Sequence, residues 1–213
     1  MPLRSSPRLS GDEPIELATL RAYVTAPLLD DAAGLLAAGA ASVIAYAFTS
    51  TCYIGGEGDD DALRARLEQR TSGVPVVTTC VAATQAMRTL GVDRVALVHP
   101  PWVSDRVNSM GAEYFRRRGL QVVMAASVPL HATAQQLEPA DVYDWVRHNT
   151  PVDAAAVFLA GNGFRTVSLI AALEAELGRP VLTANQVLLW AALRGADVRC
   201  EVVGYGQLFN HLA

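Results

Sequence analysis

The sequence predicts an α/β protein built on parallel strands that are covered by helices on both faces. Short apolar runs alternate with helix-forming segments along most of the 213 residues, a pattern typical of parallel sheets. The stretch 152–190 also contains a complete strand, glycine turn, helix and strand. Ligands of open α/β sheets bind at the carboxyl ends of the strands, so the turns at those ends are the first candidates for a site.

Each part of the stretch 152–190 has a local reason to form. The apolar run 154–160 is too short for a helix and suits a strand buried on both faces. Gly161-Asn162-Gly163 ends this strand, because glycine gives the backbone the freedom to turn. Gly178 is placed to end the next helix, and 180–183 predicts a second strand. The helix between them has one apolar face, formed by Val167, Ile170, Leu173 and Leu177.

The remaining elements follow the same alternation. Residues 1–14 show no periodicity and are expected to be poorly ordered, and 20–26 predicts a short strand. A closing helix is predicted to end near residue 194, before the tail 198–213. Strands are predicted near 42–48, 74–78, 94–98 and 121–126, and helices at 30–41, 59–70, 80–90, 105–118 and 139–149.

Composition narrows the function classes. The net charge of −4 and a pI near 5.5 argue against nucleic acid as a partner. No apolar run reaches the roughly 18 residues of a membrane span, and we expect neither a signal peptide nor membrane association. Cys52, Cys80 and Cys200 form no metal spacing and no disulfide framework, which favours a cytoplasmic protein. All 17 basic residues are arginines, which excludes a lysine Schiff base. We expect no metal and no cofactor.

Polar turns follow three of the predicted strands. They are Thr49-Ser50-Thr51, Thr78-Thr79-Cys80 and Gly161-Asn162-Gly163. Their backbone N–H groups and small hydroxyls suit a carboxylate or another anion. Each turn taken alone has a plainer explanation, since hydroxyls cap helices and glycines make turns. Because carboxyl ends of parallel strands share one edge, the three together favour a site.

Several segments resemble the aspartate/glutamate racemase superfamily, nearest to its maleate cis-trans isomerase and arylmalonate decarboxylase branch. A-Y-A-F-T-S-T-C-Y resembles the first active-site loop and F-L-A-G-N-G-F-R-T the second. L-G-R-P-V-L-T-A-N-Q-V-L-L-W and G-Y-G-Q-L-F resemble the segments that follow. The resemblance implies two similar lobes, each with a parallel sheet flanked by helices, and a pocket between them. The first lobe would be residues 1–90 with 185–213 returning to it, and the second 91–184.

The resemblance also implies the activity and the assembly. Relatives act on small carboxylic acids without a cofactor, so we expect a small carboxylic acid substrate and a homodimer or larger homo-oligomer. In the racemases and isomerases each of the two loops supplies a cysteine. Here Phe48 stands at the first of these positions and Gly161 at the second. Trp102 stands where a tyrosine is usual. Chemistry through a pair of thiols is therefore not available, and we expect no racemisation of aspartate or glutamate and no maleate isomerisation.

Two residues are the candidates for catalysis in place of the missing thiols. Cys80 is expected at a helix N-terminus, where the dipole lowers a thiol pKa, although a small buried residue is the alternative. His99 ends a strand at the ligand edge and could act as acid or base, or could be a loop histidine held by the prolines beside it. The predicted substrate-binding residues are Thr49, Ser50, Thr51, Thr79, Trp102, Gly161, Asn162 and Gly163.

Two function classes remain open at this point. The first is a lyase, resembling a decarboxylase, or an isomerase that passes through an enolate-like intermediate stabilised by the polar turns. The second is a catalytically inactive carboxylate-binding or regulatory protein on the same scaffold.

Overall fold

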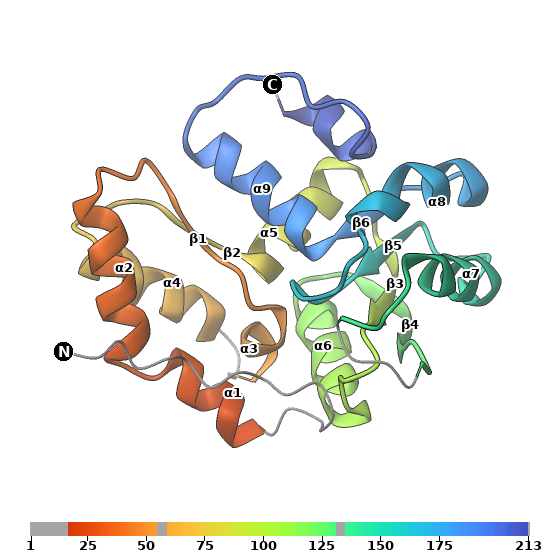
Figure 1. Ribbon diagram of the computed structural model, residues 1–213, viewed down its shortest axis with the longest axis horizontal. Helices are drawn as coiled ribbons and strands as arrows, with labels where there is room; N and C mark the ends of the chain where they lie inside the picture. Colours follow the sequence, from red (N-terminus) through yellow and green to blue (C-terminus); the bar gives the residue numbers. More distant parts are fainter. Residues whose placement is uncertain (1–16, 55–58, 131–134, 213) are drawn as a thin grey trace.

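The structure, a computed structural model, describes residues 17–54, 59–130 and 135–212. Two parallel sheets form its centre, and helices surround both (Figure 1). One sheet pairs β1 (Ile44–Tyr46) with β2 (Val76–Thr78). The other has four strands in the order β4-β3-β5-β6, all parallel. The predicted α/β class with two sheets is therefore confirmed.

Most helices and strands lie close to the predicted ranges, but the predicted turn Thr49-Ser50-Thr51 forms the first residues of a short helix, α3. The order along the chain is α1 (Leu17–Val24), α2 (Leu28–Ala38), β1, α3 (Thr49–Tyr53), α4 (Asp59–Arg70), β2, α5 (Thr79–Thr89), β3 (Arg94–His99), α6 (Asp105–Arg117), β4 (Gln121–Ser127), α7 (Pro139–Asn149), β5 (Ala156–Leu159), η1 (Val167–Leu169), α8 (Ile170–Leu177), β6 (Val181–Thr183), α9 (Ala184–Gly195) and η2 (Gln207–His211).

The prediction of a strand at 20–26 is wrong, because this segment belongs to helix α1. Leu17, Leu20 and Val24 are three and four residues apart, so a helix places them on one face. All three pack into the main hydrophobic core, and Leu20 is fully buried. The predicted disorder of residues 1–14 falls outside the described residues.

The strand–helix–strand unit forms with one difference from the prediction: Val167 is 43% exposed and lies in the 3-10 turn η1 before α8, so it is not part of the buried face of the helix. Strand β5 is buried along its whole length and pairs with β6 in parallel, with Leu159 opposite Thr183. Gly178 ends α8 in the left-handed conformation, with φ of 63°, which glycine adopts without strain. The chain then passes through β6 directly into α9.

Helix α9 connects the two sheets. It contacts β6 of the larger sheet and also β1, β2 and α5 of the smaller one, and Figure 1 shows it crossing between them. Thr183 and Gln186 form a reciprocal capping box at its start, which satisfies two backbone N–H groups. The Gln186 amide also donates to the carbonyl of Tyr205, so the C-terminal segment is held against this helix.

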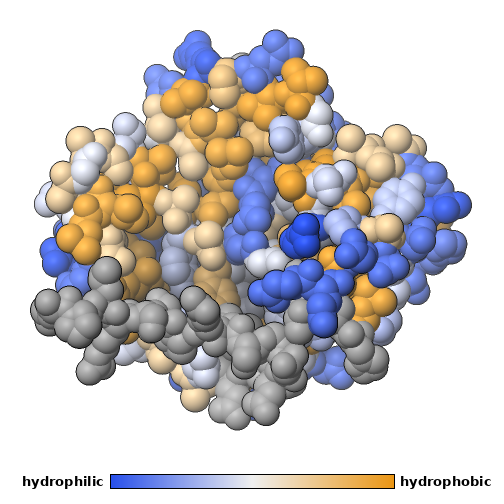
Figure 2. Space-filling model, viewed as in Figure 1, coloured by the Kyte–Doolittle hydropathy of each residue, from blue (hydrophilic) through white to orange (hydrophobic). Residues whose placement is uncertain are grey.

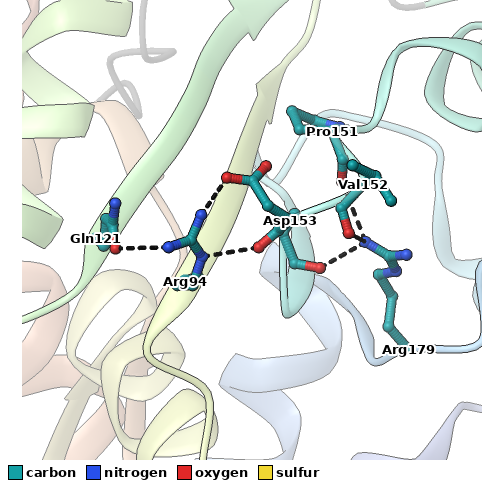
Figure 3. A network of polar contacts seen from close by, with 7 residues as sticks. Arg94, Gln121, Pro151, Val152, Asp153 and Arg179 are labelled. Carbon is teal, nitrogen blue, oxygen red and sulfur yellow. Dashed lines mark hydrogen bonds and ion pairs between the residues drawn. The ribbon is translucent and has the colours of Figure 1, made fainter.

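Two arginines anchor the amino-terminal edge of the larger sheet, at the opposite end from the polar turns. Arg94 at the start of β3 pairs with Asp153 and donates to Gln121 of β4 (Figure 3). Arg179 donates to the carbonyls of Pro151, Val152 and Ala154 before β5. These bonds hold the starts of β3, β4 and β5 together. The polar turns lie at the other ends of the strands and take no part in this network.

Candidate functional site

The turn after β1 and the turn after β5 face each other across a small cavity. Its volume is about 220 Å³. Six of the eight predicted binding residues line it: Thr49, Ser50, Trp102, Gly161, Asn162 and Gly163, together with Ala47, Phe48, Pro100 and Val103. Turns 112 residues apart in the chain are thus brought together by the parallel strands that precede them, as the strand-end argument predicts.

Thr49 and Asn162 join the two turns by hydrogen bonds. The Thr49 hydroxyl donates to Asn162 Oδ1 at 2.8 Å, and the Thr49 backbone N–H donates to the same oxygen at 3.0 Å. Thr49 Oγ1 also accepts from the Gly161 N–H at 3.2 Å. The Thr79 hydroxyl lies 3.2 Å from Asn162 Oδ1, so three donors surround one oxygen atom. This arrangement of donors resembles the way an enzyme surrounds a carboxylate or enolate oxygen.

Asn185 holds the Asn162 amide in this orientation. Asn162 Nδ2 donates to Asn185 Oδ1 at 2.9 Å, and Asn185 Nδ2 donates to the carbonyl of Asn162 at 3.0 Å. Asn185 is a site residue that was not predicted from the sequence. It is the second residue of α9 and lies two residues after β6 ends, so the argument from strand ends applies to it as well.

The residues that line the cavity offer further hydrogen-bond donors. Ser50 is one of them, and the backbone N–H groups of Asn162 and Gly163 meet no acceptor within the described part of the chain. Phe48, Trp102 and Val103 supply apolar lining. None of the residues that line the cavity has a titratable side chain.

The backbone at Gly161 disfavours a side chain at this position. Its φ is 107°, in the region that other residues rarely adopt. A Cβ here would lie 3.1 Å from Cδ of Pro100, closer than ordinary van der Waals contact. This position corresponds, by the resemblance, to the second catalytic cysteine of the superfamily, so the turn has a shape that does not suit a cysteine.

The aromatic wall is held by rings behind it. Trp102 meets Phe164 edge-on with ring centroids 6.3 Å apart, and Phe164 is buried. Tyr23 of α1 packs edge-on against Phe48 at 5.1 Å. Helix α1, which the sequence analysis misassigned, therefore supports one wall of the cavity.

Thr51 and Thr79 lie at the site without lining the cavity. The Thr51 hydroxyl donates to the Phe48 carbonyl at 2.7 Å and lies 3.0 Å from the Tyr46 hydroxyl. This places it on the far side of α3. Thr79 begins helix α5, and its hydroxyl reaches both Asn162 Oδ1 and the Tyr46 carbonyl.

Cys80 lies beneath the first turn and is fully buried. Its thiol contacts the Thr49 carbonyl at 3.6 Å. The expectation that a helix N-terminus lowers its pKa is wrong. Burial raises the pKa of the Cys80 thiol well above its usual value, with a further upward contribution from Cys52, because a thiolate is poorly solvated there. Burial therefore favours the neutral form of this thiol, which contacts Thr49 of the cavity wall.

His99 is also buried and lies outside the cavity. Its Nε2 is 3.2 Å from the Tyr53 hydroxyl, and burial lowers the pKa of His99 to about 3, so the ring is neutral. Gly111 leaves room for this pair, since a Cβ there would lie 2.9 Å from the Tyr53 ring. No sequence pattern connects Tyr53 with His99, and the sequence analysis missed this contact.

A buried carboxylate lies on the other side of α3. Asp60 Oδ2 accepts from the Thr78 hydroxyl at 2.9 Å and from the Tyr114 hydroxyl at 2.8 Å. Burial raises the pKa of Asp60, and these two bonds oppose the rise. Among the described residues no group of three or more His, Cys, Asp or Glu side chains is placed to hold a metal ion. Within the same residues, no helix is both long and apolar enough to cross a bilayer.

Fold and cavity together define an α/β protein whose candidate site lies at the carboxyl ends of strands from two parallel sheets. The sequence model of the arylmalonate decarboxylase family matches residues 23–209. The chain belongs to this family, and the resemblance inferred from its loops is confirmed. Its similarity to an arylmalonate decarboxylase and to maleate isomerases supports an enzyme of this superfamily.

Individual relatives agree with this assignment. The chain is 29% identical to arylmalonate decarboxylase of Bordetella bronchiseptica over 191 residues, which cover 86% of the chain and 77% of that protein. It is 25% identical to maleate isomerase of Geobacillus stearothermophilus over 175 residues, 79% of the chain and 69% of that protein. A structure of unliganded arylmalonate decarboxylase superimposes with a TM-score of 0.78 at 27% identity, covering 91% of this chain and 82% of that one.

Proposed function

We propose that this protein decarboxylates a small carboxylic acid bound in the cavity between the two turns. The observation that supports this most is the composition of the cavity wall. It combines residues that carry hydrogen-bond donors with apolar residues, and it contains no titratable side chain.

Decarboxylation is the reaction of this superfamily that such a wall suits best. The bond between the α-carbon and one carboxyl carbon breaks, CO₂ leaves, and the electron pair stays on the α-carbon. It delocalises into the remaining carboxyl group as an enolate, whose oxygen the Ser50 hydroxyl and the N–H groups of Asn162 and Gly163 stabilise. Water then supplies the proton to the α-carbon. No base is needed to start this sequence, because the carboxyl group that leaves as CO₂ is already ionised, and its negative charge passes to the enolate.

Racemisation and alkene isomerisation would need other groups in the same place. Racemisation requires a base on one face of the substrate and an acid on the other, and thiolate addition requires an ionised cysteine. Phe48 and Gly161 occupy the corresponding positions, and Cys80 is buried as a neutral thiol. Catalytic roles for Cys80 and His99 stay predictions, and the assay below includes their variants.

A non-catalytic binding protein is the second candidate, and the Asn162 side chain favours it. Asn162 Oδ1 accepts hydrogen bonds from the Thr49 N–H, the Thr49 hydroxyl and the Thr79 hydroxyl. A substrate oxygen can use these three donors only after it displaces the Asn162 amide. A protein that keeps the amide in place would bind a carboxylate through Ser50 and the glycine turn alone.

A substrate panel tests the proposal. The purified protein is incubated with an arylmalonate, maleate and aspartate, and CO₂ release and products are measured. We expect CO₂ from the arylmalonate and no conversion of maleate or aspartate. Cys80→Ser and His99→Gln proteins, checked for folding, show whether these residues contribute. Binding of the arylmalonate without CO₂ release would favour the second candidate, and conversion of maleate would overturn the proposed chemistry.

A further inference from the structure

A second cavity is separate from the candidate site and strongly basic. Its volume is about 850 Å³, and it lies among α4, α5 and α6. It shares no lining residue with the smaller cavity. Five arginines line it: Arg64, Arg88, Arg106, Arg117 and Arg118. Asp61 and Glu113 are its only acidic lining residues, so three positive charges are left unbalanced in a chain whose net charge is −4. We call this cavity the arginine groove.

The two carboxylates are shared unevenly among the guanidinium groups. Asp61 lies 3.3 Å from Arg118 and 3.9 Å from Arg64, and Glu113 lies 2.9 Å from Arg117. No carboxylate of the described residues pairs with Arg88 or Arg106. Arg88 donates only to the backbone carbonyl of Arg118, at 3.3 Å. Two exposed guanidiniums in the groove therefore have no acidic partner.

The inner part of the groove is fixed in place. The Arg118 guanidinium lies over the ring of Tyr114, 3.9 Å from its centroid, and its side chain is only 19% exposed. The Tyr114 hydroxyl donates to the buried Asp60. A ligand would thus meet a positioned guanidinium on an aromatic floor, which reduces the entropy lost on binding.

We propose that the arginine groove binds a small organic phosphate that carries several negative charges, such as a diphosphate group. Guanidinium groups donate two parallel hydrogen bonds to a phosphate, and several guanidiniums can share one diphosphate. The volume falls within the roughly 300–1,000 Å³ typical of small-molecule sites. The overall negative charge of the chain disfavours a nucleic acid strand, which needs an extended basic surface.

The inference does not depend on the proposed decarboxylation, and its test is separate. Binding of inorganic pyrophosphate is measured by titration calorimetry at constant ionic strength, together with the shift of Tm. We expect saturable binding with one site per chain. The Arg88→Gln/Arg106→Gln protein should bind at least about tenfold more weakly, since bonds from a charged donor contribute roughly 1.5–3 kcal/mol each.

Matched controls separate a site from general charge. The Arg147→Gln/Arg199→Gln protein loses the same two charges away from the groove and should bind within about twofold of the wild type. A Thr49→Val protein, altered at the small cavity, should do the same. Equal weakening in both arginine pairs, or no saturable binding to the wild type, would overturn the proposal, and far-UV circular dichroism verifies that every variant is folded.

Discussion

Replacing Thr49 by valine tests the connection between the two turns. Valine has the shape of threonine without the hydroxyl, so the packing of this buried residue is retained. The change removes the bond to Asn162 Oδ1 at 2.8 Å and the bond from the Gly161 N–H at 3.2 Å. Each hydrogen bond contributes about 0.5–1.5 kcal/mol net, and a buried donor left unpaired adds about 1–3 kcal/mol. We expect the free energy of unfolding to fall by about 2–4 kcal/mol.

The Thr49→Ser protein is the matched control. Serine keeps the hydroxyl and loses one methyl group, for which we expect a loss of about 1 kcal/mol. Urea unfolding followed by circular dichroism gives both values, provided that the slope of free energy against urea is unchanged. A valine protein within about 0.5 kcal/mol of the wild type, or a serine protein as unstable as the valine one, would refute the bridging role of the hydroxyl.

Three other predictions follow from the same contacts and surfaces. Below its ordinary pKa of 6.5, His99 takes up a proton in the unfolded chain but stays neutral in the folded one down to about 3. Stability is therefore lost as the pH falls, and the free energy of unfolding should be about 2 kcal/mol lower at pH 5 than at pH 7.5. The change His99→Gln should remove this difference. A His99→Gln protein with the same pH profile as the wild type would contradict the prediction. The change Gly161→Ala should lower the free energy of unfolding by about 1–3 kcal/mol, and by more than Gly73→Ala. Both glycines have positive φ, but only at Gly161 would an added Cβ meet Pro100. Equal losses in the two proteins would contradict a contribution from the contact with Pro100. Helix α2 exposes Leu28, Leu35 and Leu36, and Figure 2 shows apolar surface on the side of the molecule where α2 lies. We expect a homodimer that buries this surface and that the change Leu35→Arg weakens. A monomer mass for the wild type in light scattering would count against it.

The sequence predicts the parts of the fold that depend on local periodicity. The strand, turn and helix between 154 and 178 form as predicted, because apolar spacing and Gly178 determine them locally. The segment 20–26 was misassigned, since a short apolar stretch has too few residues to separate a period of 3.6 from a period of 2. Its helical face becomes visible only with the core against which Leu20 packs.

The site is predictable in outline and not in its contacts. Strand ends in a parallel sheet meet at one edge, so the turns containing Thr49 and Asn162 could be brought together from the sequence. The bond between them spans 113 residues and depends on side-chain geometry that no local pattern encodes. Burial decides the ionisation of Cys80 and His99, and burial at those positions requires the assembled core. The arginine groove combines residues from three helices, so it has no local signal at all.

The Ser50→Ala protein provides the most direct test of the proposed chemistry. Ser50 lines the cavity with a hydroxyl that makes no hydrogen bond within the described residues, so its removal should leave the fold intact. The quantity to measure is kcat for CO₂ release from an arylmalonate. Because removing one donor to a developing oxyanion lowers kcat by about 10²–10³, we expect a loss of that size with little change in Tm. A Ser50→Ala protein that releases CO₂ as fast as the wild type would contradict the account.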